Sequence, residues 1–236
     1  MDEHYSIALE QATNWINDNF KPIGIVVSGS IIRGNPDTRS DFDIFVIHEE
    51  SFRQRVQKIF NDVPCEIFVN NPSHIYGYFE NELKVNRPVA ASMLSTGKII
   101  KGEDNPVIRQ LIEDAKEYAV KTPARTVQQN TASRYEIATI FEDASDLLDT
   151  DEIAAAYFLE RTILLCIDFA FLVNGQPLPR AKERINKLAI LRPALGNLIK
   201  QYYQQENIDK KYRVAKQIVD KLVGHTGFFE WRSKPE

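Results

Sequence analysis

A pair of aspartates one residue apart, at the start of an apolar strand, constrains this chain more than any other feature. Asp41 and Asp43 open the run DFDIFVI over 41–47, whose β-branched and aromatic residues predict a buried strand. Because side chains alternate faces along a strand, both carboxylates point the same way while Phe42 and Ile44 point into the core. Two carboxylates roughly 6–7 Å apart on an apolar strand are costly unless a cation lies between them. The pattern therefore predicts a divalent metal site, and hard oxygen ligands of this kind suit Mg²⁺.

A Gly-Ser pair, Gly29-Ser30, lies at the end of another apolar run, 23–27, that also predicts a strand. Gly29 has no Cβ and lets a ligand approach the backbone closely. Ser30 is expected to begin a helical turn whose N–H groups and hydroxyl meet phosphate. Arg33 and Arg39 lie in the same turn-rich connection and can neutralise further phosphate charge.

The order of these residues, Gly29-Ser30, then ten residues, then Asp41-x-Asp43, resembles the signature of the polymerase-β-type nucleotidyltransferase superfamily. The segment also has Arg33-Gly34 and a serine just before the first aspartate. That variant is similar to the small bacterial members that modify aminoglycosides or lincosamides, and to minimal nucleotidyltransferases. The alternative is a solvated strand edge after an ordinary tight turn, which does not account for the whole constellation.

The resemblance implies roles for these residues. Asp41 and Asp43 would hold Mg²⁺ against the phosphates of a nucleoside triphosphate, and ATP is the commonest choice in the resembled group. A further set would bind the β and γ phosphates: Gly29, Ser30, Arg33, Arg39 and Ser40.

A third carboxylate lies in the next predicted strand, 63–69, with the sequence VPCEIFV. Glu66 is the acidic residue of that strand. In the resembled family a carboxylate on a strand after the aspartate pair completes the site, so this role falls on Glu66. Whether it acts as metal ligand or as general base stays open, and the alternative is a solvent-facing residue on an edge strand.

The remaining pattern predicts an α+β fold in which a nucleotidyltransferase domain with a mixed sheet precedes an all-α bundle. In the first domain, residues 1–120, hydrophobic periodicity predicts several helices and one short strand near 98–101. These helices are 4–19, 49–60, 72–84, 87–96 and 106–120. The second domain, residues 121–236, is similar to the helical substrate-binding domain of antibiotic nucleotidyltransferases. Its predicted helices are 125–148, 152–173, 181–191, 195–206 and 209–224.

Helix 152–173 is the most apolar of the chain, yet it carries Glu160, Arg161 and Asp168. These charges favour the core of a bundle over a membrane span, and we expect them in internal salt bridges rather than in a substrate cleft. The aromatic tail, with Phe228, Phe229 and Trp231, packs on the bundle or on a partner, so a homodimer is possible.

Charge and cysteine content narrow the function classes. The formal net charge is −4, with 12 basic and 18 acidic residues up to position 120 and 17 basic and 15 acidic after it. An acidic first half does not favour duplex nucleic acid. Two cysteines, Cys65 and Cys166, in apolar settings favour a reducing cytoplasm over a disulfide framework. The acidic first twenty residues do not resemble a signal peptide, and no apolar run indicates a membrane segment.

The sequence thus predicts an enzyme, a Mg²⁺-dependent nucleotidyltransferase that moves AMP from ATP to a hydroxyl of a small molecule and releases pyrophosphate. Three alternatives stay open. The acceptor can be a protein, as in antitoxins that adenylylate a partner toxin, or the domain can be a nucleotide-binding module without catalysis. A polymerase acting on a primer end is the third, and the lack of a basic stripe with interleaved aromatics counts against it.

Overall fold

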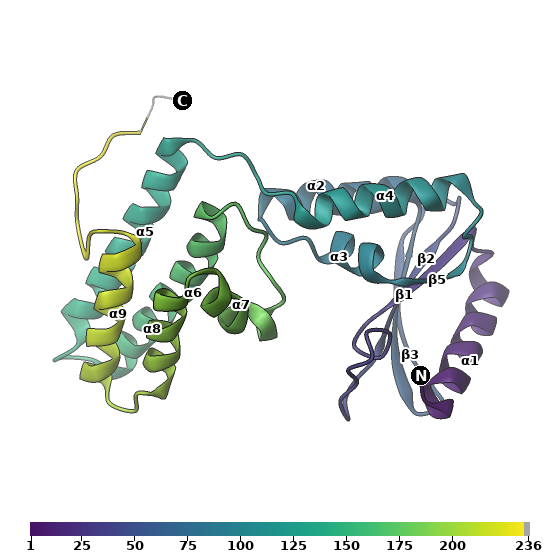
Figure 1. Cartoon of the computed structure of the whole chain (residues 1–236), viewed down its shortest axis with the longest axis horizontal. Helices are drawn as coiled ribbons and strands as arrows, with labels where there is room; N and C mark the ends of the chain where they lie inside the picture. The colour runs from purple at the N-terminus through teal and green to yellow at the C-terminus, as the bar shows by residue number, and fades with distance from the viewer. Residues whose placement is uncertain (234–236) are drawn as a thin grey trace. The chain divides into compact units, whose positions relative to one another are not determined.

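The computed structural model describes residues 1–233 (Figure 1). The chain forms two compact units, Met1–Lys121 and Thr122–Glu236. The first is built on a mixed sheet with helices on both faces, and the second is helical. This confirms the predicted fold class.

The sheet of the first unit has five strands in the order β3-β4-β2-β1-β5. β2 and β4 run parallel, whereas all other neighbours are antiparallel. The two predicted strands that carry the acidic residues are therefore direct neighbours at the centre of the sheet. The strand bounds are β1 Gly24–Ser28, β2 Phe42–Ile47, β3 Gln54–Phe60, β4 Val63–Asn70 and β5 Lys98–Lys101.

Helices cover the two faces of this sheet unequally. α1 (Glu3–Phe20) packs its small and branched side chains, among them Ala8, Ala12 and Ile16, on the face that also holds Phe42 and Ile44. α2 (Pro72–Lys84), α3 (Val89–Thr96) and α4 (Pro106–Val120) cover the opposite face, as Figure 1 shows. The face under α2 and α3 is the one that carries the acidic residues, because side chains of odd number in β2 and even number in β4 point toward it.

The predicted helix over 49–60 is wrong, because residues 54–60 form an edge strand, β3, that pairs with β4 in a hairpin. The two-residue loop is Asn61-Asp62, and both residues have positive φ, 45° and 60°. Such a turn matches the twist of a hairpin and favours Asn and Asp. β3 is an exposed edge strand with charged side chains, so its few apolar residues have a spacing that resembles that of a helix. The Asn-Asp pair was the sequence signal that indicated a hairpin turn.

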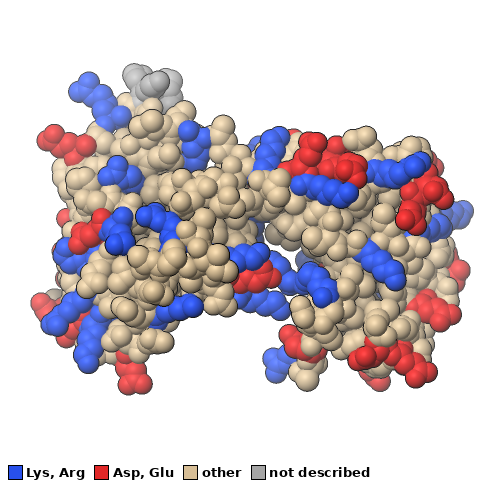
Figure 2. Space-filling model, in the orientation of Figure 1, with Lys and Arg blue, Asp and Glu red and all other residues tan. Residues whose placement is uncertain are grey.

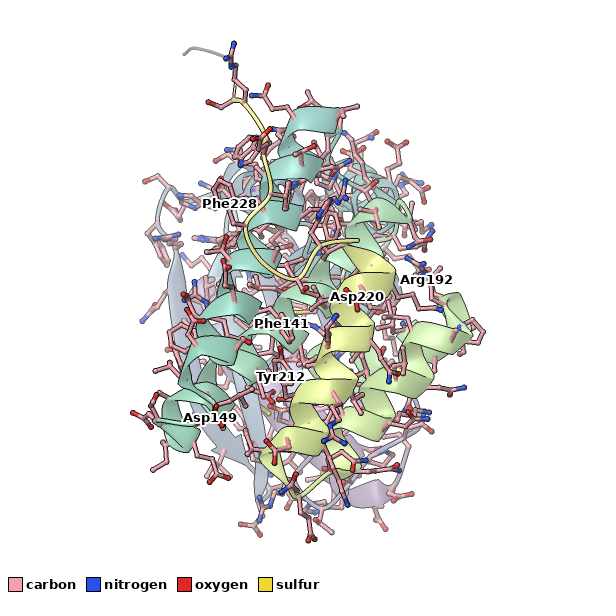
Figure 3. All side chains as sticks on the ribbon, turned by 90° about the vertical axis from the view of Figure 1, so that its left-hand side faces the viewer. Phe141, Asp149, Arg192, Tyr212, Asp220 and Phe228 are labelled. Carbon is pink, nitrogen blue, oxygen red and sulfur yellow. The ribbon has the colours of Figure 1, made fainter. Side chains whose placement is uncertain are left out.

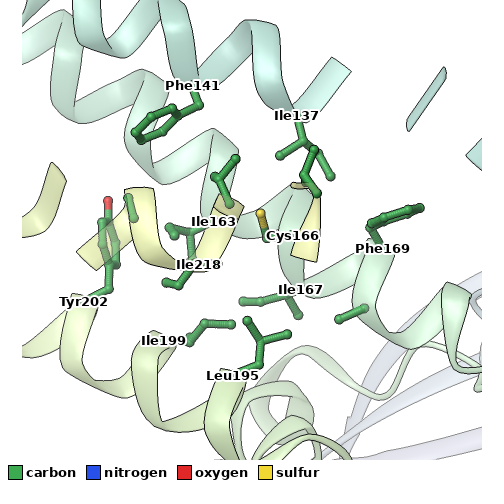
Figure 4. Packing of buried hydrophobic residues seen from close by; sticks show 14 of the residues in the cluster. Ile137, Phe141, Ile163, Cys166, Ile167, Phe169, Leu195, Ile199, Tyr202 and Ile218 are labelled. Carbon is green, nitrogen blue, oxygen red and sulfur yellow. The ribbon is translucent and has the colours of Figure 1, made fainter. Parts of the chain in front are cut away.

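The second unit packs its helices around α6 (Figure 4). Side-chain caps start several of them: Thr126 and Gln129 form a capping box on α5, and Asp151 and Asn207 cap α6 and α9. The helix bounds are α5 Val127–Leu147, α6 Glu152–Val173, α7 Arg184–Leu191, α8 Pro193–Gln204 and α9 Ile208–Leu222, with a 3₁₀ turn at Ala181–Glu183.

Aromatic contacts join distant parts of this bundle. Phe141 of α5 and Tyr212 of α9 stack at 5.1 Å between ring centroids (Figure 3). The tail packs on α5, where Phe229 and Trp231 lie 5.4 and 5.8 Å from the ring of Tyr135. The tail aromatics therefore contact their own bundle.

Of the three charged residues of α6 that we expected in internal salt bridges, only Asp168 forms one among the described residues, and Arg161 is exposed. Asp168 forms an ion pair with Arg184 at 3.2 Å, and Glu160 accepts a hydrogen bond from Tyr203 at 2.8 Å. Within residues 1–233, neither α6 nor any other helix has the length and apolar character that a membrane crossing needs. On the face drawn in Figure 2, basic and acidic side chains are interspersed over both units.

Candidate active site

Three carboxylates meet at the beginning of β2 and the middle of β4. The parallel register pairs Asp43 with Glu66, and Asp41 directly precedes β2. Each of the three offers an oxygen that lies within 4.8 Å of the other two, and all three side chains are half-buried. Grouped anions that are partly shielded from water repel one another, so the arrangement favours a cation between them.

The end of β1 lies against this carboxylate cluster, which comprises Asp41, Asp43 and Glu66. Gly29 has a φ of +112°, and a Cβ at this position would lie 2.9 Å from the Asp41 carbonyl oxygen and 3.6 Å from Asp43 Oδ2. A left-handed backbone and such close contact both require glycine. The chain therefore brings backbone, with no side chain in between, up to the two aspartates.

The predicted phosphate-binding serines are joined by hydrogen bonds. Ser30 Oγ and Ser40 Oγ lie 2.7 Å apart, and Ser40 Oγ also accepts a bond from the Asp37 N–H at 2.7 Å. After Gly29 the chain forms a hydrogen-bonded turn in which the Asn35 N–H donates to the Ser30 carbonyl at 3.0 Å. The Arg33 N–H also donates to the Gly29 carbonyl at 3.3 Å, which closes the one helical turn that was expected, and the turn does not continue into a helix.

Arg33 and Arg39 lie on the same loop with exposed side chains. This position leaves their guanidinium groups accessible to a ligand. Their contact with phosphate stays a prediction.

Sequence reasoning missed Ser28, the last residue of β1. It pairs with Asp43 across the strands, is 3 % exposed, and its hydroxyl has no hydrogen-bond partner among the described residues. A buried hydroxyl without a partner is unfavourable, so this group also fits a ligand at the cluster. Its place directly before Gly29, at the polar end of an apolar strand, was the available signal.

The match to known families agrees with this geometry. A family model described as a nucleotidyltransferase domain matches residues 9–121. The first unit is a nucleotidyltransferase domain of the polymerase-β-type superfamily. The matched residues thus coincide with the unit that carries the carboxylate cluster.

A solved structure shares the fold of the chain beyond this domain. It is a nucleotidyltransferase-like protein from Exiguobacterium sibiricum, with a TM-score of 0.56 and 15 % identity, over 92 % of this chain and 74 % of that one. At this identity the likeness concerns the fold alone. No curated protein matches the chain.

Arg55 of β3, also missed by sequence reasoning, forms an ion pair with Glu66. Its guanidinium also lies over the ring of Phe68, 5.6 Å from the centroid. One positive charge therefore offsets part of the negative charge of the nucleotidyltransferase cluster. Because this segment was predicted to be a helix, the contact of Arg55 with Glu66 could not be predicted. It is the pairing of β3 with β4 that brings the two residues together.

The residues present fit a divalent metal. Asp41, Asp43 and Glu66 supply hard oxygen ligands, and nucleotidyltransferases generally use such an ion. The unpartnered Ser28 hydroxyl and the missing Cβ of Gly29 leave polar surface and space on the β1 side.

The thiol of Cys65 lies close to the site but does not take part in it. Burial, and then the negative charge of Asp41, raise the pKa of Cys65 to about 12. The thiolate is the nucleophilic form, so at neutral pH this side chain stays protonated and unreactive.

Proposed function

We propose that this nucleotidyltransferase transfers AMP from Mg²⁺-bound ATP to a hydroxyl of a small-molecule acceptor and releases pyrophosphate. The single observation that carries the proposal is the cluster of three carboxylates beside the bare backbone of Gly29. We assign the metal to Asp41 and Asp43, with Glu66 beside it as the third carboxylate. Mg²⁺ bound there would neutralise phosphate charge and stabilise the entering and leaving oxygens.

The strand order supports an assignment of the sides from which the nucleotide and the acceptor approach the aspartates. Gly29 and Ser30 follow β1, whereas Glu66 lies on β4, and β2 with its aspartates runs between them. We place the β and γ phosphates on the β1 side, held by Gly29, Ser30, Arg33, Arg39 and Ser40. The acceptor hydroxyl then enters from the β4 side. An in-line displacement needs the entering and leaving oxygens on opposite sides of the phosphorus, and this assignment puts them toward the two opposite neighbours of β2.

Glu66 is the group that we assign to the acceptor hydroxyl. Its carboxylate takes the proton as the oxygen attacks the α-phosphorus, and the bond to pyrophosphate breaks. Arg55, which forms the ion pair with Glu66, orients this carboxylate before the acceptor arrives.

The role of the second unit as substrate-binding domain stays a prediction, as does a homodimer. The buried, free thiols of Cys65 and Cys166 suit a reducing cytoplasm, where we propose that the enzyme works.

Incubation of the purified protein with α-³²P-labelled ATP, Mg²⁺ and a panel of hydroxylated small molecules tests the proposal. We expect label in an acceptor product together with one pyrophosphate for each product formed. Label that appears only in protein would point to a protein acceptor. Release of γ-phosphate in place of pyrophosphate would contradict nucleotidyl transfer.

Glu66→Gln separates the two roles of the third carboxylate. If Glu66 takes the proton, we expect turnover to fall by about 10²- to 10⁴-fold while the Kd for Mg²⁺ and ATP stays within a few-fold of wild type. A joint loss of metal and nucleotide binding would assign it to the metal instead. Steady-state turnover and calorimetry measure the two quantities, and unchanged turnover would show that Glu66 has only a structural role.

A further inference from the structure

A cavity of about 410 Å³ opens on the same face of the sheet as the carboxylate cluster. All of its lining residues belong to the first unit. They come from β2, β3, β4, α2 and α3, and from Arg53 directly before β3. This volume lies within the usual range for small-molecule sites, about 300–1,000 Å³. None of the predicted metal or phosphate ligands lines it, so it is separate from the nucleotide site already described.

The cavity adjoins the third carboxylate. Phe45 and Phe68 lie in its floor, two residues along β2 and β4 from Asp43 and Glu66, on the same face. Two residues along a strand correspond to roughly 6–7 Å. Arg55 links the carboxylate cluster to the cavity, because it pairs with Glu66 and also lines the cavity.

The floor and one wall are apolar. The rings of Phe45 and Phe68 stack at 5.2 Å between centroids with an interplanar angle of 25°. Val89 and Met93 of α3 add aliphatic surface. Such a surface suits a flat, apolar ring.

The negative charge on the cavity wall is already engaged. The two carboxylate oxygens of Glu82 accept the Ala90 N–H at 3.0 and 2.9 Å, at the beginning of α3. Tyr78 donates its hydroxyl to Asn70 at 3.0 Å. These groups therefore shape the wall and are poor candidates for binding a cationic ligand.

The cavity also has a positive charge, on Arg53, that is available to a ligand. Arg55 projects from β3 on this face and is paired with Glu66, whereas Arg53, directly before β3, lines the cavity and makes no ion pair among residues 1–233. A guanidinium next to an apolar floor favours a carboxylate or phosphate and disfavours an ammonium.

We propose that this cavity binds the acceptor, and that the acceptor is a small hydroxylated molecule with a ring-shaped apolar body and an anionic group held by Arg53. The assignment rests on the proposed nucleotidyl transfer and names its substrate class. It places the acceptor on the β4 side of the aspartates, next to Glu66. A polycationic aminoglycoside does not fit these charges.

Saturation-transfer NMR with two ligands that share a ring and a hydroxyl tests the charge preference. We expect 4-hydroxyphenylacetate to bind the wild-type protein and tyramine to bind at least about tenfold more weakly. Arg53→Glu should reverse this order. Lys58→Glu is the matched control, because it makes the same charge change on β3, the strand that follows Arg53, but its ammonium lies over Trp15 on the other face. The control should keep the wild-type preference.

Three results would overturn the inference: preference of the wild type for tyramine, no binding of either ligand, or binding that Arg53→Glu leaves unchanged. The binding assay needs no nucleotide, so its outcome is independent of catalysis. Failure of the proposed function would show instead as absent transfer from labelled ATP while 4-hydroxyphenylacetate still binds. Failure of this inference alone would show as intact transfer without the charge preference.

Discussion

Replacement of Asp41 or Asp43 by asparagine is expected to lower nucleotidyl transfer by about three orders of magnitude or more. Each change removes one of the three carboxylates that lie within 4.8 Å of one another and with it a metal ligand. Folding should be kept, because neutralising one anion of a repulsive cluster removes an unfavourable interaction. The rate of product formation and the midpoint of thermal unfolding measure the two effects.

Asp18→Asn is the matched control, since Asp18 is exposed on α1, away from the carboxylate cluster. We expect it to match wild type in both measurements. Transfer at the wild-type rate in both cluster variants would disprove the assigned metal site. If the unfolding midpoint of a cluster variant falls so far that the protein is unfolded at the assay temperature, the aspartates act through folding.

Gly29→Ala should both destabilise the protein and abolish most of its activity. The new Cβ would lie 2.9 Å from the Asp41 carbonyl oxygen, and the backbone φ of +112° disfavours any side chain. Backbone strain of this kind costs about 1–3 kcal/mol, and relief of the close contact must move Asp41 or the end of β1. We expect a lower unfolding midpoint and a loss of transfer of at least about a hundredfold, since misplaced groups of this kind are that costly to catalysis.

Gly34→Ala separates the effect of backbone strain from the effect of displacing Asp41. Gly34 also has positive φ, 77°, but a Cβ there would meet nothing within 4 Å. This variant should show the strain in its stability while it keeps the aspartates in place and most of the activity. If Gly29→Ala and Gly34→Ala lose the same activity, the close approach of Gly29 to Asp41 has no catalytic importance.

The nucleotidyltransferase domain could be predicted from the sequence because its signature is local. The spacing from Gly29 to Asp43 and the alternation of Phe42 and Ile44 with the aspartates depend on residues close together in the chain. The structure keeps that alternation, since Phe42 and Ile44 are fully buried. Helix caps and hydrophobic periodicity likewise predicted the helices of the second unit to within a few residues.

The rest of the site depends on strand pairing that a local pattern does not contain. Glu66 meets Asp43 only because β2 and β4 pair in parallel with one particular register. Arg55 reaches Glu66 through the hairpin of β3 and β4, and the helix-like spacing over 49–60 concealed that hairpin. The cavity is even harder to predict from the sequence than these contacts, because its walls come from three strands and two helices.

Calorimetric titration with a non-hydrolysable ATP analogue, with and without Mg²⁺, tests most directly whether the carboxylate cluster holds a metal-bound nucleotide. We expect binding in the presence of Mg²⁺ that disappears without the metal and in Asp41→Asn. Asp18→Asn should bind as wild type does. Binding that is indifferent to both Mg²⁺ and Asp41, or no binding of any nucleotide, would contradict the assignment of this site.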